Sequence, residues 1–387
     1  MPPLRVGDRE EISVRSLGPI VASRLLGNTF IRFPYVLLST MAAGLGISVS
    51  ATTAILGVRE LGGLASPLAG RLADRGHERT TMVAAAALCG ACCLGIAAGG
   101  GVAVFVALML VSGAVKISAD TAQSAWVSHR VPFRRRARAM GILETSWSLA
   151  FLVGVPVCAI VTDRWGWRAP FLGLGLGMFV TAAWVWVRTP PDNPELHDEP
   201  TRRWRPPPRA RPLLAYAALQ PFAQMLLFAV AGAWFADDLG FDVAGLGLTA
   251  IAIGTAELIG TAIPTVGGDR LGVRRVAIAG MAVAVPASAC LVLVDGSRWL
   301  GLGLVVLAGV GFEISFVAAL PMITEVDPES RASMVGAVFA TATLARAVSS
   351  AVAGILFTAG GIGATGFVTA GVGLGAIWSL QRVRNHR

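Results

Sequence analysis

A duplicated signature is the feature of this sequence that most limits its fold. The run Glu60-Leu61-x-Gly63-x3-Pro67 recurs in the second half of the chain as Glu257-Leu258-x-Gly260-x3-Pro264. An Asp-Arg pair follows each copy, at Asp74-Arg75 and at Asp269-Arg270. Weak internal symmetry of this kind predicts a chain built from two related halves, an organisation in which ligands are often held between the halves.

The composition indicates that these halves lie in a membrane. Only 14% of the residues are charged and 55% are hydrophobic, whereas a soluble chain has about 25% charged residues. A membrane-spanning helix needs roughly 20 predominantly apolar residues. Twelve such stretches are predicted, at residues 20–44, 49–71, 80–99, 102–127, 139–162, 169–188, 212–236, 244–266, 274–294, 299–321, 332–357 and 362–381.

The distribution of basic residues predicts the orientation of the chain. Of the 32 Lys and Arg residues, 24 fall in loops and tails on one side, three on the other side and five within spans. The positive-inside rule therefore predicts that both termini and the central linker are cytoplasmic. The net charge of +9 then reflects orientation and contact with anionic membrane lipids, and no nucleic-acid partner is expected. A single lysine beside many arginines indicates high-GC coding, so we expect a multi-pass protein of the cytoplasmic (inner) membrane of a bacterium.

A polar, proline-rich segment divides the spans into two sets of six. The predicted units are an N-terminal bundle at residues 1–188, a cytoplasmic linker at 189–211 and a C-terminal bundle at 212–387. Residues 1–16 lack the short apolar core of a secretory signal, so the first span is expected to be retained. The predicted fold is an all-α membrane protein, with twelve transmembrane helices in two pseudo-symmetric six-helix bundles, and a monomer is expected.

Apart from arginines at the span ends, ten ionisable side chains fall within the predicted spans, and none of them lies in spans 3, 6, 9 or 12. Each would cost about 2.5 to 3.5 kcal/mol if it faced lipid, or on the order of 30 kcal/mol together, so they are expected to face protein or water. Spans 3, 6, 9 and 12 are then expected to form a lipid-facing shell. The ten are Arg24, Arg32, Arg59, Glu60, Lys116, Asp120, Glu144, Glu257, Glu313 and Arg346.

Three segments resemble those of the major facilitator superfamily, in its bacterial branch of arabinose-efflux-like and drug-antiporter-like permeases. These are Gly70-Arg71-Leu72-Ala73-Asp74-Arg75, the run from Asp269 to Arg275, and Gly166-Trp167-Arg168-Ala169-Pro170-Phe171. The resemblance implies a secondary transporter that moves a small organic solute by alternating access, as proton-coupled efflux. It also implies a cytoplasmic gate formed by Asp74, Arg75, Arg138, Asp269 and Arg270. Met109 stands where drug antiporters of the superfamily carry an Arg, which weakens the case for proton-driven drug export.

The polar residues that helical spacing and the resemblance assign to a central cavity form the predicted substrate site: Asn28, Arg32, Lys116, Gln220, Gln224, Glu313 and Arg346. Lys116 leaves two readings open. It either pairs with Asp120 one turn away and fixes packing, or binds an anionic group of the substrate. Arg24 is expected to snorkel towards the cytoplasmic interface.

A buried carboxylate can take up a proton on one side of a membrane and release it when a cation approaches. The carboxylates that are candidates for proton coupling are Glu60, Asp120, Glu144, Glu257 and Glu313. Neither an enzyme nor a cofactor or metal site is expected, because the spans hold no nucleophile, base and orienting group together. Two rival functions stay open: a lipid or glycolipid flippase on the same fold, and a membrane sensor or scaffold that does not transport.

Overall fold

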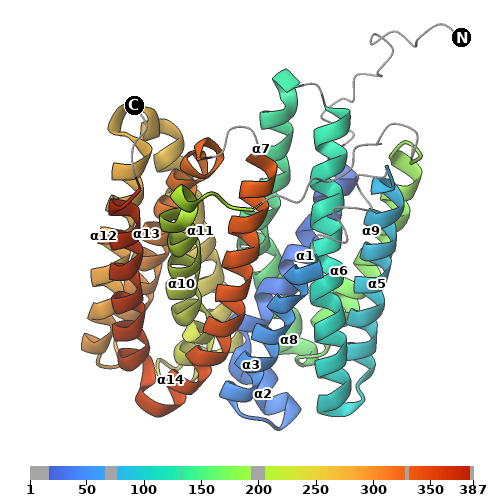
Figure 1. Ribbon diagram of the computed structural model, residues 1–387. Coiled ribbons are helices and arrows are strands. Elements are labelled where there is room, and N and C mark those ends of the chain that lie inside the picture. The colour runs from blue at the N-terminus through green and yellow to red at the C-terminus, as the bar shows by residue number, and fades with distance from the viewer. Residues whose placement is uncertain (1–16, 66–75, 132, 193–204, 327–330, 384–387) are drawn as a thin grey trace, which may run out of the picture.

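The computed structural model describes residues 17–65, 76–131, 133–192, 205–326 and 331–383, and every regular element within them is helical. The fold is that of an all-α membrane protein with two pseudo-symmetric bundles of six transmembrane helices. The bundles stand side by side, with the N-terminal half coloured blue to green and the C-terminal half yellow to red (Figure 1).

The N-terminal bundle consists of long apolar helices that are broken in places by short helical turns. Its elements are α1 (Gly18–Val36), α2 (Leu38–Leu45), α3 (Val49–Glu60), η2 (Leu61–Ala65), α5 (Glu78–Ala98), α6 (Gly101–Arg130), α7 (Phe133–Leu149), η3 (Ala150–Gly154), α8 (Val155–Trp165) and α9 (Ala169–Arg188).

The C-terminal bundle has fewer but longer elements. They are η5 (Pro208–Ala210), α10 (Arg211–Asp237), α11 (Val243–Leu271), α12 (Val273–Ala289), η6 (Cys290–Leu293), α13 (Arg298–Glu325) and α14 (Arg331–Gln381).

Within the described residues, nine helices are long and apolar enough to cross a membrane, or up to ten if the bent pair from Leu38 to Leu64 is one span. α14 is one of the nine, but Gly360 and Gly361 leave helical geometry in its middle, so it provides two spans. The predicted stretch 20–44 corresponds to α1 followed by α2, and the stretch 49–71 begins with α3. α1 carries Arg24 and Arg32, which lower its hydropathy.

Two of the predicted spans are interrupted where proline removes a backbone donor. The stretch 20–44 breaks at Leu37, just after Pro34, and the stretch 139–162 contains the π-helical turn η3 immediately before Pro156. Proline has no N–H to give to the preceding turn, so the helix must rearrange there. Turns of the η3 type often occur where a helix carries function.

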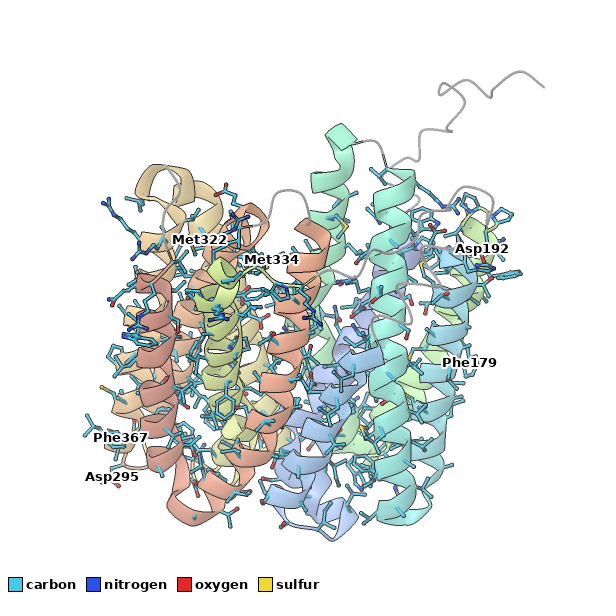
Figure 2. The ribbon with its side chains drawn as sticks, in the orientation of Figure 1. Phe179, Asp192, Asp295, Met322, Met334 and Phe367 are labelled. Carbon is cyan, nitrogen blue, oxygen red and sulfur yellow. The ribbon has the colours of Figure 1, made fainter. Side chains whose placement is uncertain are left out.

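The predicted lipid-facing shell lies at the two outer flanks of the molecule. On one flank, α5 packs against α9, and on the other α12 packs against the second part of α14. Phe179 on α9 is 40% exposed and Phe367 on α14 is 58% exposed, and they lie on opposite flanks (Figure 2). Exposed side chains of this size are suited to hydrocarbon rather than to water.

The two halves meet along α3 with α14, α8 with α11, and α1 and α2 with α10. Small residues allow the backbones to approach closely there. A Cβ atom on Gly57 would lie 2.6 Å from the carbonyl oxygen of Ala347, and one on Gly232 would lie 2.2 Å from that of Tyr35. Ser39 donates a 2.7 Å hydrogen bond to Asp237 nearer the turns between α2 and α3 and between α10 and α11.

The beginning of the predicted linker is tied to the N-terminal bundle. Asp192 accepts hydrogen bonds from the backbone N–H groups of Arg79 (2.7 Å) and Thr80 (3.1 Å), at the N-terminus of α5. A carboxylate at this position satisfies helix donors that would otherwise be unpaired. Since α9 ends at Arg188 and α10 begins at Arg211, we retain the boundaries at 188 and 212 as a proposal.

Candidate functional site

A polar network around Lys116 crosses the interior of the N-terminal bundle. Lys116, on α6, donates hydrogen bonds to Asp120 on the same helix and to Asn28 on α1, the latter at 2.7 Å. Asn28 in turn donates to Ser146 on α7 at 3.0 Å. Lys116 is 5% exposed and Asn28 is fully buried. These contacts agree with the self-neutralising reading of Lys116, and they leave its substrate role a prediction.

Arg24 belongs to the same network, and the expectation that it snorkels is wrong. Its guanidinium donates to Glu144 on α7 at 2.7 Å and lies 4.0 Å from Asp120. The Arg24 side chain is only 10% exposed, because these two carboxylates hold it inside the bundle. Arg24, which was expected at the membrane interface, thus contacts two of the candidate proton-coupling residues, Asp120 and Glu144.

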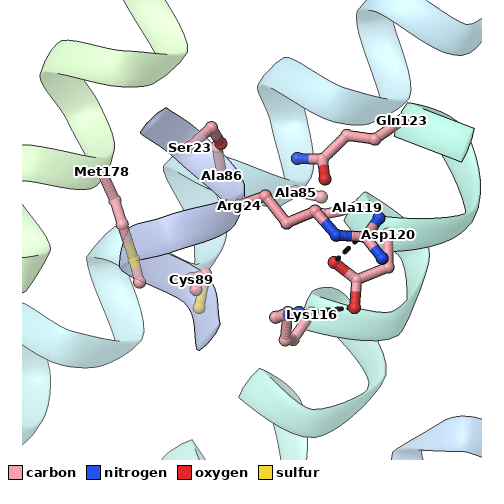
Figure 3. A pocket seen from close by; sticks show the side chains of 11 residues that line it. Ser23, Arg24, Ala85, Ala86, Cys89, Lys116, Ala119, Asp120, Gln123 and Met178 are labelled. Atoms are coloured by element: carbon pink, nitrogen blue, oxygen red, sulfur yellow. Dashed lines mark hydrogen bonds and ion pairs between the residues drawn. The ribbon is translucent and has the colours of Figure 1, made fainter. Parts of the chain in front are cut away.

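A pocket with about 280 Å³ of empty volume adjoins this network (Figure 3). It is lined from α1 by Arg24, from α5 by Cys89, from α6 by Asp120 and Gln123, and from α9 by Met178. Three buried atoms have no hydrogen-bond partner in the described part of the chain: Gln123 Oε1, Arg24 Nε and Asp120 Oδ1. Such groups are costly in an apolar interior, so the pocket is suited to water or another small polar occupant.

A second charged pair connects the two halves of the molecule. Arg32 on α1 donates from Nη1 to both carboxylate oxygens of Glu257 on α11, at 2.9 Å each. The guanidinium carbon lies 3.9 Å from the ring centre of Trp147 and 4.0 Å from that of Phe151. Cation–π contacts are worth about 0.5 to 2 kcal/mol, depending on exposure, so the rings and the carboxylate together hold Arg32 in place.

Glu313, on α13, differs from the other carboxylates inside the spans. It accepts a 3.2 Å hydrogen bond from Thr261 on α11, but it has no salt-bridge partner among the described residues. Gly260 allows the approach, because a Cβ atom there would lie 2.5 Å from that of Glu313. A carboxylate in this setting can be protonated without leaving a cation unpaired.

The third cluster surrounds Glu60, where α3 meets α14. Glu60 accepts from Arg59 at 3.1 Å and lies 3.6 Å from Nε of Arg346 on α14. Arg59 is 1% exposed and also donates to the carbonyl oxygen of Ile31 at 3.0 Å. Glu60 and Glu257 occupy equivalent positions of the duplicated signature, and each pairs with an arginine of the opposite half.

The predicted glutamines of α10 lie together. Gln220 is fully buried, and its Nε2 donates to the carbonyl oxygen of Phe312 on α13 at 3.2 Å and approaches Gln224 at 3.4 Å. Of the predicted gate, Asp74 and Arg75 lie outside the described residues. The side chains of Arg138, Asp269 and Arg270 do so too, although their backbones belong to α7 and α11. The gate therefore stays a prediction.

Sequence reasoning missed Trp147 and Phe151, which contact Arg32. Their spacing of four residues on one helical face was an available signal, because residues so spaced are neighbours on the surface of a helix. The described residues contain no group of three or more His, Cys, Asp or Glu side chains that could hold a metal ion. The five cysteines are free, and four of them are buried.

Comparison with known proteins gives the family. Residues 21–268 and 213–386 match the model of the Major Facilitator Superfamily. A solved structure of the nucleoside transporter NupG, in a mutant form, is similar with a TM-score of 0.74 and 13% identity, over 96% of this chain and 100% of that one.

A bacterial homolog of the human lysosomal transporter Spinster is also similar. In its inward-facing and occupied conformation, the TM-score is 0.71 with 15% identity, over 96% of this chain and 93% of that one. In the unoccupied conformation the TM-score is 0.68 with 14% identity, over 96% and 94%. At these identities the two relatives establish the fold, whereas the family match extends over nearly the whole chain. The chain belongs to the Major Facilitator Superfamily and is a transporter rather than an enzyme.

Proposed function

We propose that this transporter moves a small organic solute out across the cytoplasmic membrane of a bacterium, driven by protons, by alternating access between its two halves. The single observation that carries the proposal is the pairing state of the intramembrane charges. Nine of the ten form salt bridges, and Glu313 alone has no such partner among the described residues. A lone carboxylate beside a charge pair that joins the halves is a suitable site for coupling a proton to their movement.

The coupling step follows from simple electrostatics. While Glu313 and Glu257 are both ionised, they repel each other, and protonation of either carboxylate relieves this repulsion. Protonation of Glu257 removes the charge that Arg32 faces and so weakens the link between α1 and α11. Proton binding can thereby change the equilibrium between closed and open arrangements of the halves.

The proposed orientation has both termini in the cytoplasm, in accord with the positive-inside rule. Contacts such as Ser39 with Asp237 then lie towards the outer end, so this conformation has its halves joined on the outside. Asp120, Glu144 and Glu60 already have salt-bridge partners, so we assign them to positioning. The proposed substrate-binding residues remain Asn28, Arg32, Lys116, Gln220, Gln224 and Arg346.

The proposal is tested with purified protein in two stages. Small organic solutes are first screened for thermal stabilisation at acidic and neutral pH, with Lys116→Ala as the control for a site in the N-terminal bundle. Solutes that stabilise are then tested for counterflow and for pH-gradient-driven uptake into proteoliposomes. We expect the gradient to accelerate transport by the natural protein and not by Glu313→Gln. If the pH gradient has no effect on transport by either protein, proton coupling is excluded. If no stabilising solute shows counterflow, transport of small organic solutes is excluded.

A further inference from the structure

A second pocket lies inside the C-terminal bundle, between α10, α13 and α14. It is partly open, and its empty volume of about 340 Å³ includes the open space at its mouth. Its lining includes Ala217, Gln220, Pro221, Phe316, Phe339 and Arg346. Glu313 is not among the residues that line it.

One wall of this pocket offers hydrogen-bond acceptors without partners. Gln220 is fully buried and its Nε2 donates to the carbonyl of Phe312, while its Oε1 has no hydrogen-bond partner among the described residues. Pro221, one residue further along α10, has no N–H and so leaves the carbonyl of Ala217 without its usual helical bond. Because unsatisfied acceptors are costly within a membrane, this wall is suited to an N–H or O–H donor of a ligand.

Arg346, on α14, adds a cation to the lining of the pocket. The Arg346 side chain is 35% exposed, and its guanidinium contacts Glu60 only at 3.6 Å through Nε and Thr343 only at 3.4 Å. Arginine has five N–H donors, so most of its capacity to bind a carboxylate or a similar anion is still free. Glu60 keeps Arg59 as its partner if Arg346 turns to a ligand, because that pair is shorter at 3.1 Å.

Two aromatic residues also line this pocket. Phe316 comes from α13 and Phe339, which is 45% exposed, comes from α14. Phenyl faces favour another flat ring in stacked or edge-on contact, worth about 0.5 to 1.5 kcal/mol beyond the buried area.

We propose that this pocket binds a flat aromatic solute that carries one anionic group, held by Arg346, and one N–H donor, held by Gln220 and the carbonyl of Ala217. The inference rests on the proposed transport function, for which it names the class of solute. Ligand binding at Arg346 would also affect the interface between the two halves. An anion on Arg346 competes with Glu60 for the guanidinium and thus loosens the α3–α14 contact.

Four small probes separate the three required features. The first is 4-aminobenzoate, which has the ring, the anion and the donor. Benzoate lacks the donor, aniline lacks the anion, and cyclohexanecarboxylate lacks both the flat ring and the donor. Binding to the purified full-length protein is measured by calorimetry and by the shift in Tm. We expect 4-aminobenzoate to bind about tenfold more tightly than benzoate or aniline, the effect of one charged or buried hydrogen bond.

Three variants and one control assign the contacts. Arg346→Gln should remove the preference for 4-aminobenzoate over aniline, and Gln220→Met should remove the preference for 4-aminobenzoate over benzoate. Phe339→Ala should reduce the preference for benzoate over cyclohexanecarboxylate. Arg382→Gln, just beyond the end of α14, should change none of these. The Tm without ligand and the elution profile show whether each variant is folded.

The outcomes are decisive in both directions. Equal binding of all probes, binding of none of them, or full 4-aminobenzoate affinity in folded Arg346→Gln protein would overturn the assigned solute class. None of these outcomes would contradict the proposed function, because pH-gradient-dependent transport of another solute would still support it. Conversely, selective probe binding without counterflow would support the pocket and count against transport.

Discussion

Arg32 of the N-terminal half donates from one guanidinium nitrogen to both carboxylate oxygens of Glu257 in the C-terminal half, at 2.9 Å each. Both side chains are nearly removed from solvent, at 7% and 12% exposed. Removing one partner of a buried pair leaves an uncompensated charge and typically costs about 3–5 kcal/mol. The stability of this conformation should therefore depend on the pair as a unit.

We expect Glu257→Gln to lower the Tm of the purified protein clearly, because Arg32 is left without a counterion. The double variant Arg32→Gln with Glu257→Gln should recover much of that loss, since no charge remains unpaired. A double variant no more stable than the single one would show that the charges do not act as a pair.

Glu313→Gln should behave in the opposite way. No described cation depends on Glu313, so we expect a Tm equal to or above that of the natural protein. Counterflow, which needs no proton gradient, should persist in this variant, whereas accumulation driven by a pH gradient should be lost. Glu144→Gln is the matched control, because it removes a carboxylate that pairs with Arg24 instead. If Glu144→Gln lost gradient-driven accumulation while Glu313→Gln kept it, the coupling role of Glu313 would be wrong.

The close approach at Gly232 predicts a packing effect. A Cβ atom there would lie 2.2 Å from the carbonyl oxygen of Tyr35 and 2.4 Å from that of Val36, so backbone must move to admit it. Gly232→Ala should lower the free energy of unfolding of this conformation by about 1–3 kcal/mol, the usual cost of overpacking. Gly371→Ala is the control, because no atom lies within 4 Å of the added Cβ. Equal Tm values for the two variants would contradict a tight contact between the halves.

The predicted cytoplasmic gate can be tested although its side chains lie outside the described residues. Asp74→Asn should impair transport while the amount of protein in the membrane stays normal, because an amide is a weaker partner than a carboxylate for helix N-termini and arginines. Asp269→Asn, in the second copy of the signature, provides the internal comparison. Unchanged transport in both variants would count against a latch at this end.

The sequence predicted the helices better than their interruptions. The stretches 102–127 and 299–321 correspond to α6 (Gly101–Arg130) and α13 (Arg298–Glu325), because long apolar runs bounded by polar loops define such helices. The break at Leu37 and the π-helical turn at Ala150–Gly154 could not be located in the same way. Proline signals that a rearrangement occurs, but neighbouring helices decide which one.

The charged residues of the site could be predicted from the sequence, but most of the pairs that they form could not. Helical spacing alone sufficed to predict the Lys116–Asp120 contact, since both residues lie on α6. The pairs of Arg32 with Glu257 and of Arg346 with Glu60 join the two halves, and so depend on how each helix is rotated and on how the bundles meet. Sequence patterns contain neither quantity. The same limit explains why Arg24 was assigned to the interface when Glu144 holds it inside.

The most direct test of the central claim, that the halves open and close against each other, is a reversible cross-link at Ser39 and Asp237. These side chains are 2.7 Å apart across α2 and α10. Both are replaced by cysteine in a background that lacks the five natural cysteines. Oxidation should join the halves and abolish counterflow, reduction should restore it, and each single cysteine variant should transport under both conditions. Full cross-linking with undiminished counterflow would contradict the account.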